Sequence, residues 1–399
     1  MFAGVPGRGA EEGWYLTSLC IELARLEGRH ITGGSADVMK CFDQIQRPLL
    51  YELLRMSGLP SDFVNLYQDM LDNLQVVNNI SGYIGEPHRH PCGIPQGCPL
   101  SMTFIGLLFR PWILRMQQLG VTPRVLADDI LITAEGNNQY IDFCAGYDAT
   151  IEYVTDIGGK LAPDKSVLFS TSRVTRRSLR LRSWRRLCGT RIQVKCAFRD
   201  LGTHINLGMR QAGATINDRM KAACSTAERI VNLPMTNAKK QRILRGLTLA
   251  KALYGTEAAP PSCTAIAHLR AVMVDALGFR GHFTCAELAF QVSQVAGELD
   301  PLINIFVRRA TLLRRIIARF PDVRHIARLA IRIYGDLAMP GTSGALGLDK
   351  PKAAACWGPI GLLLTSMAQH NCVLSEELKV TPFDSCTDFD LMGLPSQDF

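Results

Sequence analysis

Two adjacent carboxylates, Asp128 and Asp129, interrupt an apolar stretch that reads RVLADDILIT. The flanking Val, Leu, Ile and Thr residues favour two short strands joined by a tight turn. Two like charges side by side in a buried hairpin are costly unless a cation compensates them. Pairs of Asp residues are also common in solvated surface turns, so this motif alone leaves a surface turn as the alternative to a metal site.

A third carboxylate, Asp37, lies upstream in SADVMKCFDQI, where it ends an expected strand, and Phe42 and Asp43 follow at the entry to a helix. We expect Asp43 to cap that helix rather than to bind metal. Asp37, Asp128 and Asp129 supply hard oxygen ligands at strand ends, which is what a pair of Mg²⁺ ions requires when phosphates must also bind. We therefore predict that the three carboxylates converge on neighbouring strands of an antiparallel sheet covered by helices.

The remaining pattern predicts the elements that position these acids. Apolar residues at helical spacing occur over 14–27, and a short strand then leads to Asp37. Pro48 opens a helix that stops near Gly58, and Ser61 and Asp62 are candidate caps for the next helix. We further expect strand-like runs at 74–80 and 81–86, a Gly/Pro-rich loop GIPQGCPLS, a helix over 101–118 kinked at Pro111, a helix over 138–156, strands near Val167 and Ile205, and mainly helices from 208 onward.

Composition indicates a globular protein with a small excess of positive charge. The chain has 399 residues, of which 47% are hydrophobic and 20% are charged, so it has enough apolar surface for roughly two or three compact units. Lys and Arg number 44 against 36 Asp and Glu, giving a net charge of +8. This excess is mild support for a polyanionic partner.

Thirteen cysteines are present, but none falls in a C-x-x-C pair, which disfavours a zinc site. The N-terminal FAGVPGRGAEEG lacks the basic and apolar regions of a secretory leader. We therefore expect reduced thiols in an intracellular protein, nuclear or cytoplasmic. The most apolar long stretch, TFIGLLFRPWILRM, is interrupted by Arg and Pro, so we expect no membrane partner.

Positive charge is concentrated in two runs. The segment 173–199 contains ten Lys or Arg residues and no acid, with Trp184 among them. Unrelieved charge beside an aromatic favours contact with phosphates and bases, and a solvated face is the alternative. The second run, over 308–332, is spaced like the polar face of helices and leaves the same two interpretations open. The predicted nucleic-acid-binding residues in the first run are Arg176, Arg177, Arg180, Arg182, Trp184, Arg185 and Arg186.

Five motifs follow one another in a characteristic order: ADVMKCFD, GIPQGCPLS, LADD, GGKLAPDKS and DLGTHI. In sequence and order they resemble the reverse transcriptases of non-LTR (LINE-like) retrotransposons and their group II intron relatives. The resemblance runs from about Phe2 to Leu207, half of the chain. It implies an α+β fold: a right-hand polymerase palm, with an antiparallel sheet packed on helices, followed by a mainly helical C-terminal half. The implied domains are a remnant of the fingers over 1–36, the palm over 37–207 and a thumb-like or retroelement-specific region over 208–399.

The resemblance also implies roles at the metal site. Asp37, Asp128 and Asp129 are expected to be the catalytic metal ligands, and the carbonyl of Val38 is expected to face the metal and the triphosphate. The implied cofactor is Mg²⁺, as two ions, with Mn²⁺ as a substitute.

Other implied roles concern the substrates. Phe42 matches the aromatic residue that blocks a ribose 2′-OH, and Gln96 and Gly97 match the positions against the incoming nucleotide and template. Lys165 matches a lysine near the triphosphate. Leu201 and Gly202 fall at the hairpin that grips the primer end. From the residues alone, Phe42 could equally be core, Gln96 could satisfy loop backbone and Lys165 could be an ordinary surface lysine.

The chain departs from the family pattern at Leu126, usually aromatic, and at Ala162, usually Asn. Its start, MFAGVPGRGA, resembles the end of the fingers region, so we expect the upstream basic strands to be missing. The implied function is an RNA-directed DNA polymerase that uses an RNA template, a DNA primer and deoxynucleoside triphosphates. The alternative is a catalytically inactive retroelement fragment that only binds nucleic acid.

Overall fold

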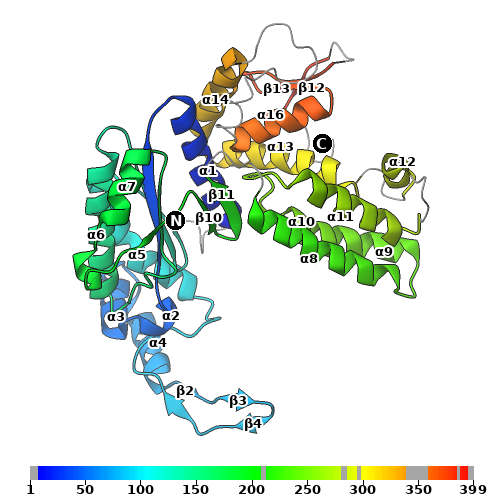
Figure 1. Cartoon of the computed structure of the whole chain (residues 1–399). Coiled ribbons are helices and arrows are strands. Elements are labelled where there is room, and N and C mark those ends of the chain that lie inside the picture. The colour runs from blue at the N-terminus through cyan, green and yellow to red at the C-terminus, as the bar shows by residue number, and fades with distance from the viewer. Residues whose placement is uncertain are drawn as a thin grey trace. The chain divides into compact units, whose positions relative to one another are not determined.

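The structure is a computed structural model that describes residues 8–207, 213–279, 285–293, 298–337, 358–383 and 387–393. The chain packs as two compact units (Figure 1). The first unit comprises residues 1–13 and 29–195, and the second comprises residues 14–28 and 196–399. The break between Lys195 and Cys196 precedes the boundary that we placed at Leu207, and the domain assignment itself stays a prediction.

A five-stranded sheet forms the centre of the first unit, in the order β6-β7-β1-β8-β9. Neighbouring strands are antiparallel except for the parallel pair β8 and β9. The bounds are β1 Ile31–Asp37, β6 Thr122–Leu126, β7 Asp129–Glu135, β8 Val167–Ser170 and β9 Gln193–Val194. The residues of β7 between its ends are all buried, which explains its mainly apolar sequence.

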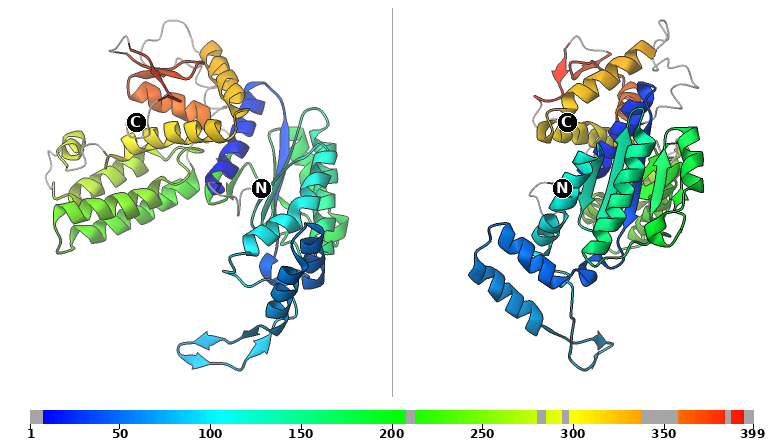
Figure 2. Two further views of the ribbon diagram at one scale, coloured as in Figure 1. Left: turned by 180° about the vertical axis from the view of Figure 1, so that it is seen from behind. Right: turned by 90° about the vertical axis from the view of Figure 1, so that its left-hand side faces the viewer.

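Two long helices, α5 (Ser101–Gln118) and α6 (Gln139–Asp156), pack against this sheet (Figure 2). Trp112 of α5 is fully buried, and its indole N–H donates to Thr150 Oγ1 of α6 at 3.0 Å. The helix over 101–118 is therefore confirmed, and it continues through Pro111.

Shorter elements precede α5: α2 (Cys41–Gln44), α3 (Arg47–Met56) and α4 (Ser61–Asn73). Our capping predictions were wrong, because Pro60 is the N-cap of α4, and Asp43 lies inside α2. An arm follows, in which β2 (Gln75–Val76) pairs with β5 (His88–Arg89) and β3 (Asn79–Ile80) pairs with β4 (Tyr83–Ile84).

The second unit is mainly helical, as predicted. It holds most of α1 (Ala10–Leu26) and the hairpin of β10 (Ala197–Asp200) and β11 (Thr203–Asn206). The sequence did not predict its three-stranded sheet, made of β12 (Cys372–Leu374), β13 (Lys379–Pro382) and β14 (Phe389–Asp390). Its other elements are α8 (Ala214–Val231), α9 (Asn237–Ile243), the π-helix η2 (Leu244–Leu249), α10 (Ala250–Leu253), α11 (Cys263–Ala276), α12 (Ala286–Gln291), α13 (Pro301–Arg319), α14 (Val323–Leu337) and α16 (Pro359–Gln369). The fold class, α+β with a helical second half, is confirmed.

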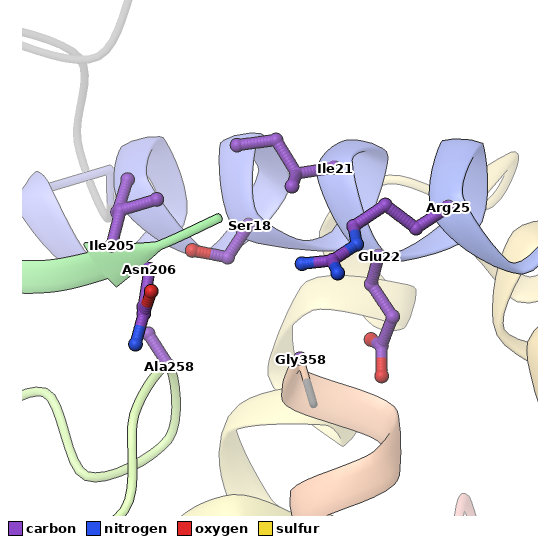
Figure 3. A pocket seen from close by; sticks show the side chains of 8 residues that line it. All are labelled: Ser18, Ile21, Glu22, Arg25, Ile205, Asn206, Ala258 and Gly358. Atoms are coloured by element: carbon purple, nitrogen blue, oxygen red, sulfur yellow. The ribbon is translucent and has the colours of Figure 1, made fainter. Parts of the chain in front are cut away.

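A buried carboxylate ties α1 to α16 within the second unit (Figure 3). Glu22 accepts hydrogen bonds from the backbone N–H groups of Ile360 and Gly361, at 2.9 and 2.8 Å, and from the Tyr334 hydroxyl at 2.8 Å. Burial raises the pKa of Glu22 to about 7, although these donors act in the opposite direction. Glu22 thus satisfies the open N–H groups at the start of α16 from another element.

Among the residues that the structure describes, no helix is long and apolar enough to span a membrane.

Candidate active site

Two of the predicted acids lie opposite each other in the sheet. β1 and β7 pair antiparallel, and Asp37, the last residue of β1, lies opposite Asp129, the first residue of β7. β7 also pairs with β6, and Leu126 lies opposite Asp129 across a turn formed by Ala127 and Asp128. Directly opposite residues in antiparallel strands have Cα atoms about 4.5–5.5 Å apart. The register and the turn therefore place the backbone of all three acids at one end of the sheet.

The environment of these acids leaves them open to solvent. Asp128 and Asp129 are exposed and Asp37 is half-buried. Burial, with the negative charge of Asp128 as a second cause, raises the pKa of the Cys41 thiol to about 12, so this carboxylate lies near the start of α2. Within the described ranges, no group of three or more His, Cys, Asp or Glu side chains is arranged to hold a metal ion.

The turn that carries Asp128 has an unusual backbone. Ala127 has φ of +57°, in the left-handed region that a residue with a Cβ rarely adopts. Such strain is compatible with a stable fold only where the surrounding structure holds the residue. Here the paired strands on both sides of the turn hold it.

The loop that contains Lys165 is bonded to the end of β1. Ala162 N–H donates to the Asp37 carbonyl at 2.8 Å, and Asp37 N–H donates to Ser166 Oγ at 3.2 Å. Lys165 itself is exposed. Asp37 and Ser166 are 129 residues apart in the chain and belong to different motifs, and this hydrogen bond joins the two motifs in one local structure.

Val38 pairs with Leu161 in an isolated antiparallel bridge. The hydrogen bonds beside it come from Met39 N–H to Lys160 and from Ala162 N–H to Asp37. Because backbone groups alternate in direction along a strand, the carbonyl of Val38 is directed away from this loop. Its role as a metal ligand stays a prediction.

The GIPQG loop is fastened to α2 by its first residues. Gly93 N–H donates to the Ile45 carbonyl and Ile94 N–H donates to the Phe42 carbonyl, both at 2.8 Å. Gly93 has φ of +88°, and a Cβ there would lie 2.8 Å from the backbone of Asp43. No residue other than glycine fits this position without moving the loop.

The side chains beyond this anchor point differ in exposure. Phe42 is half-buried and packs against the core of the first unit, while Gln96 and Gly97 are exposed. Hydrogen bonds thus connect α2, the GIPQG loop, the end of β1 and the Lys165 loop.

Comparison with known proteins identifies the family. A sequence profile described as "Reverse transcriptase (RNA-dependent DNA polymerase)" matches residues 4–204. The chain belongs to the reverse transcriptase family. The Transposon TX1 uncharacterized 149 kDa protein of Xenopus laevis is 25% identical over 142 residues, which are 33% of this chain and 11% of that protein. The Retrovirus-related Pol polyprotein from type-2 retrotransposable element R2DM of Drosophila melanogaster is 25% identical over 170 residues, which are 40% of this chain and 16% of that protein.

Both relatives are much longer than the segments that match. The reverse transcriptase chain matches 11% and 16% of their length, and both are retroelement proteins by name, which supports the predicted LINE-like affiliation. Among solved structures, telomerase from Candida tropicalis aligns with a TM-score of 0.38 and 10% identity over 81% of this chain and 52% of that one. Telomerase from Candida albicans gives 0.34 and 11% over 79% and 53%. Similarities of this size carry no conclusion about function.

Leu201 and Gly202 form the turn between β10 and β11, and both have positive φ, +45° and +83°. This turn belongs to the second compact unit of the reverse transcriptase, whereas the three acids belong to the first. Contact of Leu201 and Gly202 with a primer therefore stays a prediction.

The basic run folds as α7 (Arg173–Leu181) and a short 3₁₀ helix, η1 (Arg185–Leu187). The structure corrects the prediction for Trp184, which is fully buried and packs on Tyr147 with ring centroids 4.6 Å apart. A ring enclosed in the core cannot stack on a base. The aromatic residue in the basic run is therefore part of the core that supports α6.

Three of the predicted arginines have partners inside the protein. Arg182 pairs with Asp148 and Arg186 with Glu152, both at 2.7 Å, and Arg176 donates to the Ser170 carbonyl at 2.6 Å. The side chains of the others, Arg177, Arg180 and Arg185, are exposed and make no ion pair or hydrogen bond within the described part of the chain. The same is true of Arg173, which lies on one helical stripe with Arg177 and Arg180.

Sequence reasoning missed Arg47, which shapes the GIPQG loop. Its side chain is buried, and it donates through Nε to the Gly93 carbonyl and through Nη1 to the Leu71 carbonyl, both at 2.9 Å. An arginine at the start of a helix normally indicates a solvated residue, so no local signal marks this role.

Proposed function

We propose that this chain carries the polymerase centre of an RNA-directed DNA polymerase, in which Asp37, Asp128 and Asp129 hold two Mg²⁺ ions with help from the Val38 carbonyl. The observation that carries the proposal is the register of Asp37 opposite Asp129, with Asp128 in the adjoining turn. Family membership supports the same conclusion, because reverse transcriptases generally use divalent metal ions.

The residues fit such ions by donor chemistry. Carboxylate oxygens are the ligands that Mg²⁺ prefers, and the exposure of Asp128 and Asp129 leaves positions for phosphates. When bound, the ions would favour deprotonation of a primer 3′-OH and neutralise the charge of the triphosphate and pyrophosphate. To share the ions, the three carboxylates have to move closer together than they are in the structure. Their mutual repulsion opposes this movement until cations are present.

The other residues act by position. Phe42, whose backbone is fixed by Ile94 N–H, would exclude a 2′-OH from the sugar of the incoming deoxynucleoside triphosphate. Gln96 and Gly97, at the exposed end of the anchored GIPQG loop, would contact that nucleotide and the RNA template. Lys165 would contact the triphosphate, because its loop is bonded to the backbone of Asp37.

A second candidate function is nucleic-acid binding without catalysis. The exposed arginines of α7 favour it independently of the acids, because a stripe of cations without acidic partners attracts a phosphate backbone. The DNA primer and RNA template would then bind, but no nucleotide would be added.

Primer extension distinguishes the two candidates. The chain is incubated with a labelled DNA primer on an RNA template, deoxynucleoside triphosphates and Mg²⁺ or Mn²⁺, and Asp128→Asn is compared with Asp69→Asn, an exposed acid on α4. Polymerase function predicts extension that Asp128→Asn abolishes and Asp69→Asn preserves. Retention of the hybrid in a binding assay without extension under any of these conditions would favour the second candidate.

A further inference from the structure

A cavity of about 310 Å³ lies beside the GIPQG loop in the first unit. Its walls include Leu74 and Val76 at the start of the arm, His90 at the arm's end, and Ile94 and Gln96 of the loop. The volume is at the lower limit for small-molecule sites, which suits a single ring system. The start of the arm and the stretch from the arm's end into the GIPQG loop thus line one space.

Arg47 also lines this cavity, and it gives the cavity a charged donor. The residue is only 5% exposed, and its Nε and Nη1 are occupied by the carbonyls of Gly93 and Leu71. Its remaining nitrogen, Nη2, has no partner in the described ranges and is not among the buried side-chain atoms that lack one, so solvent reaches it. A buried guanidinium with one unused donor nitrogen favours a ligand with a hydrogen-bond acceptor.

Local charge disfavours a free anion as that ligand. Asp72 lies 3.6 Å from Arg47 Nη1 and offsets part of its positive charge, and Asp43 is a further acid among the lining residues. The walls formed by Leu74, Val76 and Ile94 are apolar. A neutral, flat group with an acceptor at its edge meets these conditions better than a phosphate does.

We propose that this cavity binds one unpaired nucleobase of the polynucleotide strand held by the enzyme, with an acceptor on the base facing Arg47 Nη2. The proposal rests on the proposed function, because it takes the bound polymer to be nucleic acid. The loop supports this location: Ile94 lines the cavity and also fixes Phe42 through its N–H, and Gln96 is at the wall. A strand that runs past Gln96 has the cavity within its path.

Abasic scanning tests the proposal by binding alone. A series of RNA templates annealed to a DNA primer carries one abasic nucleotide at each successive position, and the dissociation constant is measured by fluorescence anisotropy. Burying one base contributes roughly 1–3 kcal/mol, so we expect about 5- to 150-fold weaker binding at a single template position and small changes elsewhere. An incoming nucleotide is not part of the strand and cannot produce this pattern.

Val76→Phe fills the cavity, and Val77→Phe is the matched control. Val76 is half-buried at the cavity wall, whereas the neighbouring Val77 is 43% exposed and is not part of the lining. We expect Val76→Phe to bind the intact template as weakly as the wild type binds the critical abasic template, and to be insensitive to the abasic change. Val77→Phe should retain the wild-type pattern. Thermal unfolding verifies that both variants fold, and the smaller substitution Val76→Met replaces Val76→Phe if that variant does not.

The outcomes separate this proposal from polymerase function. Uniform sensitivity along the template in the wild type, or a position-specific effect that persists when the cavity is filled, would overturn the base site while leaving primer extension unaffected. Absence of any binding to the hybrid would instead contradict both proposals.

Discussion

Asp37 and Asp129 lie directly opposite each other at the ends of β1 and β7. Like charges in directly opposed positions of an antiparallel pair repel each other and are destabilising. Bound cations would offset the repulsion between these two carboxylates. This relationship makes the acids testable without any assay of catalysis.

The first prediction is that Asp129→Asn binds Mg²⁺ more weakly than the wild type, because the variant lacks one of the carboxylates that we propose to hold the ions. Mg²⁺ should raise the unfolding temperature of the wild type but not that of the variant. Thermal unfolding in EDTA and in Mg²⁺ measures this effect, with Asp69→Asn as the control. Equal stabilisation of wild type and Asp129→Asn by Mg²⁺ would place the ion elsewhere.

Phe42 provides a prediction about sugar choice. Phe42→Ala should admit ribonucleotides while largely preserving deoxynucleotide use, since it removes a steric block. Because Phe42 also packs on the core, the variant should lose about 1–3 kcal/mol of stability. Leu53→Ala, which removes another half-buried side chain from the same core, is the control for stability loss alone. Unchanged selectivity in Phe42→Ala, measured as the ratio of kcat/KM values, would assign the ring to the core.

Gly93 and Gly97 should respond differently to alanine. Both have positive φ, but a Cβ at Gly93 meets the backbone of Asp43 and Phe42 at 2.8 Å, whereas a Cβ at Gly97 meets nothing within 4 Å. Gly93→Ala should therefore cost about 3 kcal/mol or more, and Gly97→Ala about 1–2 kcal/mol. Urea unfolding measures these losses.

Gly97→Ala also provides a test of activity, because this variant is expected to lose less stability. If Gly97 allows close approach of nucleotide or template, Gly97→Ala should fold and still extend primers poorly. Normal primer extension by folded Gly97→Ala would show that Gly97 does not lie against the nucleotide or the template.

The arginines of the basic run divide into two classes with different expected effects. Neutralising Arg173, Arg177 and Arg180 should flatten the dependence of log affinity for RNA on log salt, by roughly 0.7–0.9 for each phosphate that the protein no longer neutralises. Neutralising Arg182 and Arg186, which pair with acids of α6, should leave that slope unchanged. Anisotropy titrations at several salt concentrations measure the slopes. Identical slopes for the triple and the double variant would show that the arginines of α7 form a solvated face that does not contact RNA.

Local patterns predicted the elements around the acids well. The short strand that ends at Asp37, the turn at Asp128 and the helix over 101–118 all depend on neighbours in the sequence, and the structure has each of them. Such features follow from residue spacing and strand propensity, which are visible in one sequence.

Features with partners far away in the chain were not predictable. Trp184 is core only because Tyr147 lies beneath it, and Arg47 is buried only because carbonyls of Gly93 and Leu71 accept its hydrogen bonds. The same limit applies to Glu22, whose partners Tyr334 and Gly361 are more than 300 residues away. A charged or aromatic residue in a basic or solvated pattern gives no local sign of such interactions.

Glu22 leads to the last prediction, which concerns pH. Its pKa is about 7 in the folded protein against an ordinary value of 4.5, so the folded state keeps a proton that the unfolded state releases. The stabilisation is fully present below about pH 4.5 and is lost as the pH rises to about 7, a change of roughly 3 kcal/mol.

Glu22→Gln cannot titrate, and its amide N–H₂ would oppose the N–H groups of Ile360 or Gly361. We therefore expect the variant to be less stable than the wild type, with the largest difference near pH 4.5 and a smaller one near pH 7.5. Urea unfolding across this range measures the difference, with Glu228→Gln, an exposed acid on α8, as the control. A difference that grows with pH would mean that Glu22 is ionised at the start of α16 throughout, with a pKa below its ordinary value.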